Sequence, residues 1–305
     1  AGDALNTGSY NVAVGMQALS ADTKGAKNVA VGQGALESQN FTVATDSYNT
    51  AVGHVAGLSI TTGVNNTFVG GLAGDANTTA DNNTAVGYSS LGANTTGAQN
   101  TVVGQGAGES NTTGVSLAAL GRQALEANTT GDNNVALGQR ALFSSTTADN
   151  NTAMGNEALK ENTTGAQNVA VGAFALDANT SASNNVAIGK DALTANTTGG
   201  NNTAIGTYAL DSNTEAASNV AVGYLALGDN TTGAQNVGIG TNALDANTTG
   251  ANNTGIGHAA LSANTTADDN TAVGRDALGA NTTGSLNVAA GKGALAANTT
   301  GAKNT

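Results

Sequence analysis

The chain has 305 residues, of which 43 are Gly, 3% are aromatic and 10% are charged, and it contains no Pro, Cys or Trp. An ordinary globular domain carries about 25% charged residues, and this chain has too few large apolar side chains for a conventional deep core. Abundant Val, Ile and Thr disfavour disorder, and the absence of Pro excludes collagen. The formal net charge of −12 disfavours nucleic acid and anionic membranes as partners. A non-enzymatic repeat protein is the class that remains.

One pentapeptide, Asn-(Val/Thr)-Ala-(Val/Ile)-Gly, recurs along the whole chain. Its Gly occurs 17 times, and 15 of the 16 intervals between these glycines are 17 residues long. The other interval is 21 residues, because four extra residues lie within 37–48, around Phe41, Thr42 and Val43. We number the repeat from its Asn as coil position 1. The copy that begins at 168 supplies the residues of the structural repeat: Asn168, Val169, Ala170, Val171, Gly172, Leu176 and Asn179.

The elements expected within one coil follow in chain order. Positions 2–4 predict a short strand, since β-branched residues dominate positions 2 and 4. Position 4 is apolar in all 17 copies, which predicts that its side chain is buried together with the Leu at position 9. Position 3 is Ala or Gly in 15 copies, and we expect it to face outward against a closely packed neighbour, or else to fit a cramped sheet face within the chain. The Ala-Leu segment predicts a second strand or a helical turn, and Asn-Thr-Thr-Gly predicts a turn.

A 17-residue unit is too short for a helix pair or a propeller blade. A stack of β-hairpins favours Asn-Gly or Asp-Gly turns, yet no Asn in the chain is followed by Gly. One circuit per repeat, with strands stacked in parallel at about 4.8 Å, satisfies the spacing and places the Asn residues of positions 1 and 12 in ladders. The sequence therefore predicts an all-β parallel β-solenoid of about 17–18 coils, a single continuous rod over residues 1–305.

The repeat resembles two groups of known proteins. Asn-(Val/Thr)-Ala-(Val/Ile)-Gly is similar to the core of the YadA-type head repeat of trimeric autotransporter adhesins. The longer unit, Ala-Leu-x-x-Asn-Thr-Thr-Gly-x-Asn-Asn-Thr-Ala-(Val/Ile)-Gly, resembles tandem repeats of phage tail fibres. The resemblance covers essentially the whole chain. It implies a homotrimer of parallel solenoids, with small residues at the three-fold interface, in an extracellular, cell-surface or virion setting.

Candidate catalytic and metal sites are sparse. The string from Gly104 to Gly108 lacks a complete dinucleotide-binding fingerprint. His54 and His258 are twelve coils apart and predict exposed surface residues, so no nucleophile and base can be assembled locally. Asp residues beside Asn at position 16 leave calcium open, although the calcium β-roll motif is absent. Those residues are Asp81, Asp132 and Asp149.

Three features leave binding alternatives open. The Thr ranks that follow Asn at position 12, from Thr78 and Thr95 onward, suggest an ice-binding face or simply turn chemistry, and they also form N-glycosylation sequons. The aromatic residues Tyr88, Phe174 and Tyr224 at positions 6 and 7 suggest a lateral glycan patch. The insertion at Phe41, Thr42 and Val43 is a candidate contact loop.

The function expected from the sequence is a structural fibre shaft of a phage tail fibre or cell-surface adhesin, which presents a binding tip outside this chain to a host receptor or glycan. A self-assembling extracellular filament and an ice-binding solenoid are the alternatives. We expect no enzymatic activity, no cofactor and no membrane insertion.

Overall fold

The computed structural model describes all residues from 1 to 305. The chain folds as an all-β parallel β-solenoid of about 16 coils with a 17-residue repeat, and it contains no helix. It divides into two units, Ala1–Asn151 and Thr152–Thr305, each of which is described by itself. The predicted fold class is confirmed.

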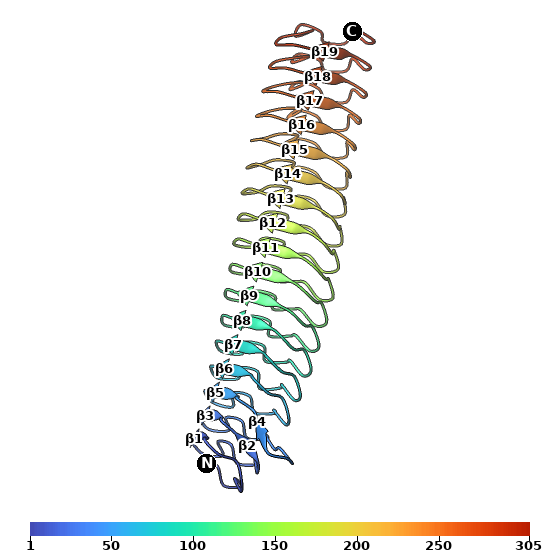
Figure 1. Ribbon diagram of the computed structural model, residues 1–305. Coiled ribbons are helices and arrows are strands. Elements are labelled where there is room, and N and C mark those ends of the chain that lie inside the picture. The colour runs from blue at the N-terminus through green and yellow to red at the C-terminus, as the bar shows by residue number, and fades with distance from the viewer. The chain divides into compact units, whose positions relative to one another are not determined.

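In the first unit, each coil contributes one three-residue strand to a parallel sheet (Figure 1). These strands are β1 (Val12–Val14), β3 (Val29–Val31), β5 (Thr50–Val52), β6 (Thr67–Val69), β7 (Thr84–Val86), β8 (Thr101–Val103), β9 (Ala118–Leu120) and β10 (Val135–Leu137). A second, two-stranded sheet pairs β2 (Gly25–Ala26) with β4 (Thr45–Asp46), next to the 21-residue repeat. The insertion thus widens the solenoid locally and leaves the register of the main sheet unchanged, because β3 pairs directly with β5.

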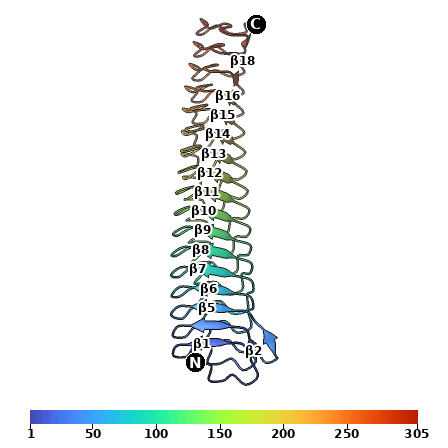
Figure 2. The ribbon, with the colours of Figure 1, turned by 60° about the vertical axis from the view of Figure 1, so that its left-hand side comes forward.

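The second unit repeats the same coil without an insertion, and its strands lie one above another along one side (Figure 2). The strands are β11 (Thr152–Met154), β12 (Val169–Val171), β13 (Val186–Ile188), β14 (Thr203–Ile205), β15 (Val220–Val222), β16 (Val237–Ile239), β17 (Thr254–Ile256), β18 (Thr271–Val273) and β19 (Val288–Ala290). Each strand pairs with the next in parallel, with equivalent positions opposite each other, as in Ala187 opposite Ala204.

The orientation predicted for the strand is wrong. Position 3 points into the solenoid, where Ala170, Ala187 and Ala204 are completely buried, while positions 2 and 4 point outward. Ile188 and Ile205 at position 4 are 38% and 37% exposed. The physical reason is the thinness of the coil: the space behind the sheet is already filled by Ala at position 8 and Leu at position 9, so only a small side chain fits at position 3.

Exceptions to the repeat show that positions 3 and 9 share one core. Position 9 is Gly rather than Leu in only three coils, at Gly57, Gly74 and Gly108. A Cβ on Gly74 would lie 2.6 Å from the ring of Phe68, and one on Gly108 would lie 3.4 Å from the side chain of Val102. Phe68 and Val102 are the large residues at position 3, and both are completely buried. Volume lost at position 9 is therefore replaced from position 3, as a close-packed interior requires.

The Ala-Leu segment forms neither a strand nor a helical turn. Position 9 adopts the left-handed region, with φ of 56° at Leu176 and 53° at Leu227, and position 7 does the same. A right-handed helical turn is excluded by these dihedrals. The N–H of Leu227 instead donates to the carbonyl of Ala243 in the next coil, at 2.9 Å. Burial of the Leu side chain offsets a backbone strain of about 1 kcal/mol per residue.

Two columns of Asn fill the polar part of the interior. At position 12, Nδ2 of Asn230 donates to Oδ1 of Asn213 at 3.0 Å and to the carbonyl of Gly233 at 2.9 Å. At position 1, the backbone N–H of Asn236 donates to Oδ1 of Asn219 at 2.9 Å. Nδ2 of Asn219 also donates to the carbonyl of Gly233. The two ladders thus converge on one carbonyl per coil and satisfy polar groups that are fully buried.

The position-12 ladder is interrupted at Ser145, which replaces Asn. Ser145 Oγ and Oδ1 of Asn128, one coil earlier, are buried without a hydrogen-bond partner. We predict that Ser145→Asn stabilises the protein by about 1 kcal/mol or more, because the new amide restores the donor for Asn128. Thermal unfolding followed by circular dichroism tests this, with the exposed Ser181→Asn as the control. An unchanged or lower Tm for Ser145→Asn contradicts the prediction.

Candidate functional surface

The main surface feature of both units is the outward side of the sheet, formed by positions 2 and 4 of every coil. We call it the sheet face. Neither position carries a charged residue in any coil, although the chain contains 30 charged residues at other positions. Position 4 of the first unit comprises Val14, Val31, Val52, Val69, Val86, Val103, Leu120 and Leu137. Position 4 of the second unit comprises Met154, Val171, Ile188, Ile205, Val222, Ile239, Ile256, Val273 and Ala290.

Local structure makes this face regular. Because the strands pair in parallel and in register, Ile239 lies directly beside Ile256 and Val237 beside Thr254. Neighbouring strands are about 4.8 Å apart and alternate residues along a strand about 6.6 Å apart. The Gly at position 5 ends each strand and adds no side chain. The result is an array of apolar and Thr side chains with no charge within it, which is unusual for a surface that remains in water.

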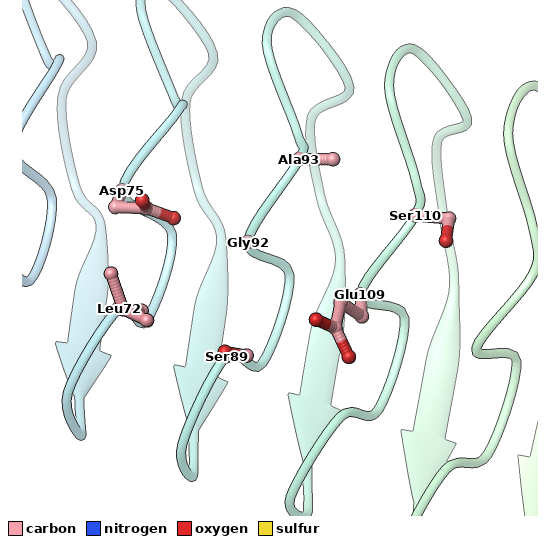
Figure 3. A pocket seen from close by; sticks show the side chains of 7 residues that line it. All are labelled: Leu72, Asp75, Ser89, Gly92, Ala93, Glu109 and Ser110. Carbon is pink, nitrogen blue, oxygen red and sulfur yellow. The ribbon is translucent and has the colours of Figure 1, made fainter.

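A shallow pocket lies on the other side of the coil, where position 10 of one coil is Gly92 (Figure 3). The missing side chain leaves a gap between the carboxylates of Asp75 and Glu109, and Ser89 and Ser110 supply hydroxyls. Burial raises the pKa of both carboxylates, and for Glu109 the neighbouring Glu126 and Asp75 add to the rise. No group of three or more His, Cys, Asp or Glu side chains in the protein is arranged to hold a metal ion.

The insertion forms a second polar hollow, lined by Tyr10, Lys24, Thr45 and Asp46 among others. Nζ of Lys27 lies 2.7 Å from Asp46 and 2.8 Å from the hydroxyl of Tyr48, and these bonds raise the pKa of the lysine.

The three residues of the predicted contact loop have different environments. Phe41 is buried, and its N–H donates to Oδ1 of Asp22 at 3.2 Å. Thr42 accepts a hydrogen bond from Lys24 through its carbonyl at 2.9 Å, while Val43 is 67% exposed. Phe41 therefore anchors the insertion, and only Thr42 and Val43 are available at the surface.

The Asp residues at position 16 serve the backbone. Oδ1 of Asp81 accepts the N–H of Val64 at 2.7 Å, Asp132 accepts the N–H of Val115 at 2.8 Å, and Asp149 accepts the N–H of Asp132 at 2.8 Å. Each carboxylate thus links two coils. Their recurrence therefore has a structural explanation.

The two histidines and the glycine string from Gly104 to Gly108 do not form a site either. Nδ1 of His258 lies 3.9 Å from Oδ1 of Asp276, with both side chains exposed, and His54 belongs to the other unit. Gly104 directly follows β8, and Gly106 and Gly108 lie in the turns after it. None of these residues is joined by a second reactive group in a pocket.

The Thr ranks that follow position 12 have a structural use. Thr95 Oγ1 donates to the carbonyl of Thr112 at 3.0 Å, and Thr248 does the same to Thr265. The O–H donors of this rank are therefore used within the protein, while the next residue of the coil is exposed, as at Thr249. The Asn that precedes these Thr residues is completely buried in the coils up to Asn281, as at Asn179 and Asn230, whereas Asn298 in the last coil is half-buried. Burial therefore excludes glycosylation of these sequons in the folded protein, except at Asn298.

The repeat residues named from the sequence separate into inward and outward groups. Asn168, Ala170, Leu176 and Asn179 are buried, while Val169 and Val171 belong to the sheet face. Sequence reasoning missed this face, since it assigned the apolar residues of position 4 to the interior. The sequence signal that identifies the true inward side is the occurrence of large residues at position 3 near coils in which position 9 is Gly.

Comparison with known proteins gives no assignment: no family model matches the chain, and no curated protein matches it. The structure contains no helix with the length and hydrophobicity needed to cross a membrane.

Proposed function

We propose that the chain is a non-enzymatic structural protein, a β-solenoid shaft that assembles with further copies of itself through the sheet face. The observation that carries the proposal is the array of apolar side chains at position 4 in each unit, which lies outside the solenoid without a charged residue in any coil. Surfaces of this kind mark protein–protein interaction sites. The resemblance to tail-fibre and adhesin repeats favours a parallel homotrimer in a virion or cell-surface setting.

Parallel assembly suits the repeat. When copies lie side by side in the same direction, every coil can present the same face at the same height, so one weak contact is repeated at each coil. The face also combines β-branched residues at both positions, which lose little side-chain entropy on packing. We expect no cofactor to be needed, and a receptor or glycan to be bound mainly by parts outside this chain.

The solution mass tests the proposal. We expect the wild-type chain to sediment at three times its mass of 29.3 kDa, because burial of the sheet face drives assembly. A triple variant with Lys at Ile205, Ile239 and Ile256, each 37% exposed in one chain, should sediment as a monomer with an unchanged circular dichroism spectrum.

The matched control places three Lys residues at the exposed turn positions Thr198, Thr232 and Thr249, and it should remain assembled. A wild-type monomer at all concentrations contradicts the proposal. Open-ended filaments in electron microscopy would favour the filament alternative. A monomer with thermal hysteresis would favour ice binding, for which the relevant observation is a run of Thr at position 2 on the sheet face: Thr50, Thr67, Thr84 and Thr101.

A further inference from the structure

Every aromatic residue of the second unit lies at the same corner of the coil. Phe174, Tyr208 and Tyr224 occupy positions 6 and 7, directly after the strand, within four successive coils around β12–β15 (Figure 1). Lys190 and Asp191 occupy positions 6 and 7 of the intervening coil. We call these five residues the rim patch. Aromatic residues make up only 3% of the chain, so their confinement to this corner requires an explanation.

Four of the five side chains of the rim patch, those of Lys190, Asp191, Tyr208 and Tyr224, contact one another. The rings of Tyr208 and Tyr224 meet edge to face, with centroids 6.1 Å apart and planes at 77°. Nζ of Lys190 lies 5.2 Å from the centroid of the Tyr208 ring and 3.4 Å from its hydroxyl, and it forms an ion pair with Asp191. Tyr224 is 49% exposed. These contacts hold the two Tyr rings in place before any partner binds, which lowers the entropic cost of binding.

The backbone beneath the patch is equally well ordered. The N–H of Tyr208 donates to the carbonyl of Lys190 at 3.2 Å, and the N–H of Asn242 donates to the carbonyl of Tyr224 at 3.0 Å. Equivalent positions of adjacent coils are about 4.8 Å apart, so Phe174 and Tyr208, two coils apart, are separated by about 10 Å. The patch is therefore a narrow strip, one corner wide, that follows the direction in which the coils stack.

From this geometry we propose that the rim patch binds a neutral linear polysaccharide. The C–H faces of pyranose rings stack on aromatic rings, and Tyr presents an apolar ring with a polar hydroxyl. Thr207 lies at position 6 of the coil of Tyr208, and Thr241 and Asn242 lie at positions 6 and 7 of the coil that follows Tyr224. These side chains supply donors and acceptors for sugar hydroxyls.

Shape and charge distinguish this ligand from other partners. A globular partner needs an interface of about 800 Å² on each side, which is far wider than this strip, whereas an extended chain follows it. The ion pair of Lys190 with Asp191 leaves the patch without net charge, and the net charge of the protein is −12. A neutral polymer therefore fits better than an anionic one. The rim patch lies beside the sheet face rather than on it, so the proposal does not depend on assembly.

Affinity electrophoresis of the full chain tests the proposal, in native gels that contain laminarin, glucomannan or hydroxyethyl cellulose, with alginate as an anionic comparison. We expect at least one neutral polymer to retard the wild-type protein. Tyr208→Ala and Tyr224→Ala should weaken this binding at least tenfold. Tyr88→Ala should change it less than twofold, because Tyr88 is exposed in the first unit and is the only aromatic residue at positions 6 and 7 there.

Three results overturn the proposal: no retardation by any neutral polymer, retardation by alginate alone, or equal retardation of the wild type and both Tyr variants. Sedimentation of the same variants separates this question from assembly. We expect Tyr208→Ala and Tyr224→Ala to keep the wild-type mass, whatever that mass is, because neither residue belongs to the sheet face.

Discussion

Gly70→Ala is expected to destabilise the first unit by about 3 kcal/mol or more, while Gly71→Ala, one residue further along, changes stability by less than about 0.5 kcal/mol. Gly70 occupies position 5, where the chain turns out of strand β6 with φ of 140°. L-residues rarely adopt this dihedral. A Cβ there would also lie 2.6 Å from the carbonyl carbon of Gly87 in the next coil, and that backbone is fixed by its own hydrogen bonds.

Gly71 provides a matched control because it is adjacent to Gly70 but has neither the positive φ nor the close backbone contact. Its φ is not positive, and a Cβ on it would first meet the ring of Tyr88 at 3.6 Å, an ordinary van der Waals distance. Other coils carry His, Gln or Arg at this position. Thermal and urea unfolding followed by circular dichroism measure both variants. Equal destabilisation by the two substitutions would show that the backbone of position 5 is not the cause.

Asn230→Ala is expected to cost about 2–3 kcal/mol, because it removes a member of a fully buried ladder. Asn230 donates to Asn213 and Gly233, and its Oδ1 accepts from Nδ2 of Asn247 at 2.8 Å. Truncation therefore leaves Oδ1 of Asn213 without a donor and Asn247 without one acceptor. Burial of such groups without partners is costly. Asn156→Ala is the control, since Asn156 is exposed at position 6 and should tolerate the change.

Asn230→Asp separates the hydrogen bonds of the ladder from its packing, because the two side chains have the same shape. A buried carboxylate cannot donate to Asn213, so we expect a larger loss than for Ala at neutral pH. Burial raises the pKa of such a carboxyl in the folded state. The destabilisation should therefore be full above that raised pKa and diminish as the pH falls through it, since the protonated carboxyl can donate again. Loss of stability that is independent of pH would contradict this account of the ladder.

The period, the parallel register and the two Asn ladders could be predicted from the sequence, because each follows from strict repetition at 17 residues. The inward side of the strand could not be predicted from hydropathy alone. Val and Ile at position 4 are the most apolar residues of the strand, yet they lie outside, as at Ile188. Space is limiting, because the interior holds one layer of Leu side chains and only a residue as small as Ala then fits at position 3. The pair Phe68 and Gly74 illustrates this limit on space, because a large residue at position 3 accompanies Gly at position 9.

The candidate surface was predictable only in part. The aromatic residues Phe174 and Tyr224 were recognisable from their positions in the repeat, but the contribution of Lys190 depends on side-chain geometry that composition does not reveal. Similarly, the role of Asp81 and Asp132 as backbone acceptors depends on the close approach of the next coil. The left-handed backbone at Leu176 was not foreseen, since propensity favours a helical turn for Ala-Leu and tertiary hydrogen bonding overrides it.

Most backbone hydrogen bonds join adjacent coils, and this has a consequence for how such chains evolve. Within a unit, the surroundings of a coil are supplied by its two neighbours, and equivalent positions of different coils meet equivalent atoms. A duplication or deletion of 17 residues, cut at any position of the repeat, therefore joins surfaces that already match. Recombination between copies can lengthen or shorten the protein in steps of about 4.8 Å, and no new kind of contact between coils has to arise. Exchanges such as Phe68 with Gly74 restrict this freedom, because coils that carry them must be inherited together.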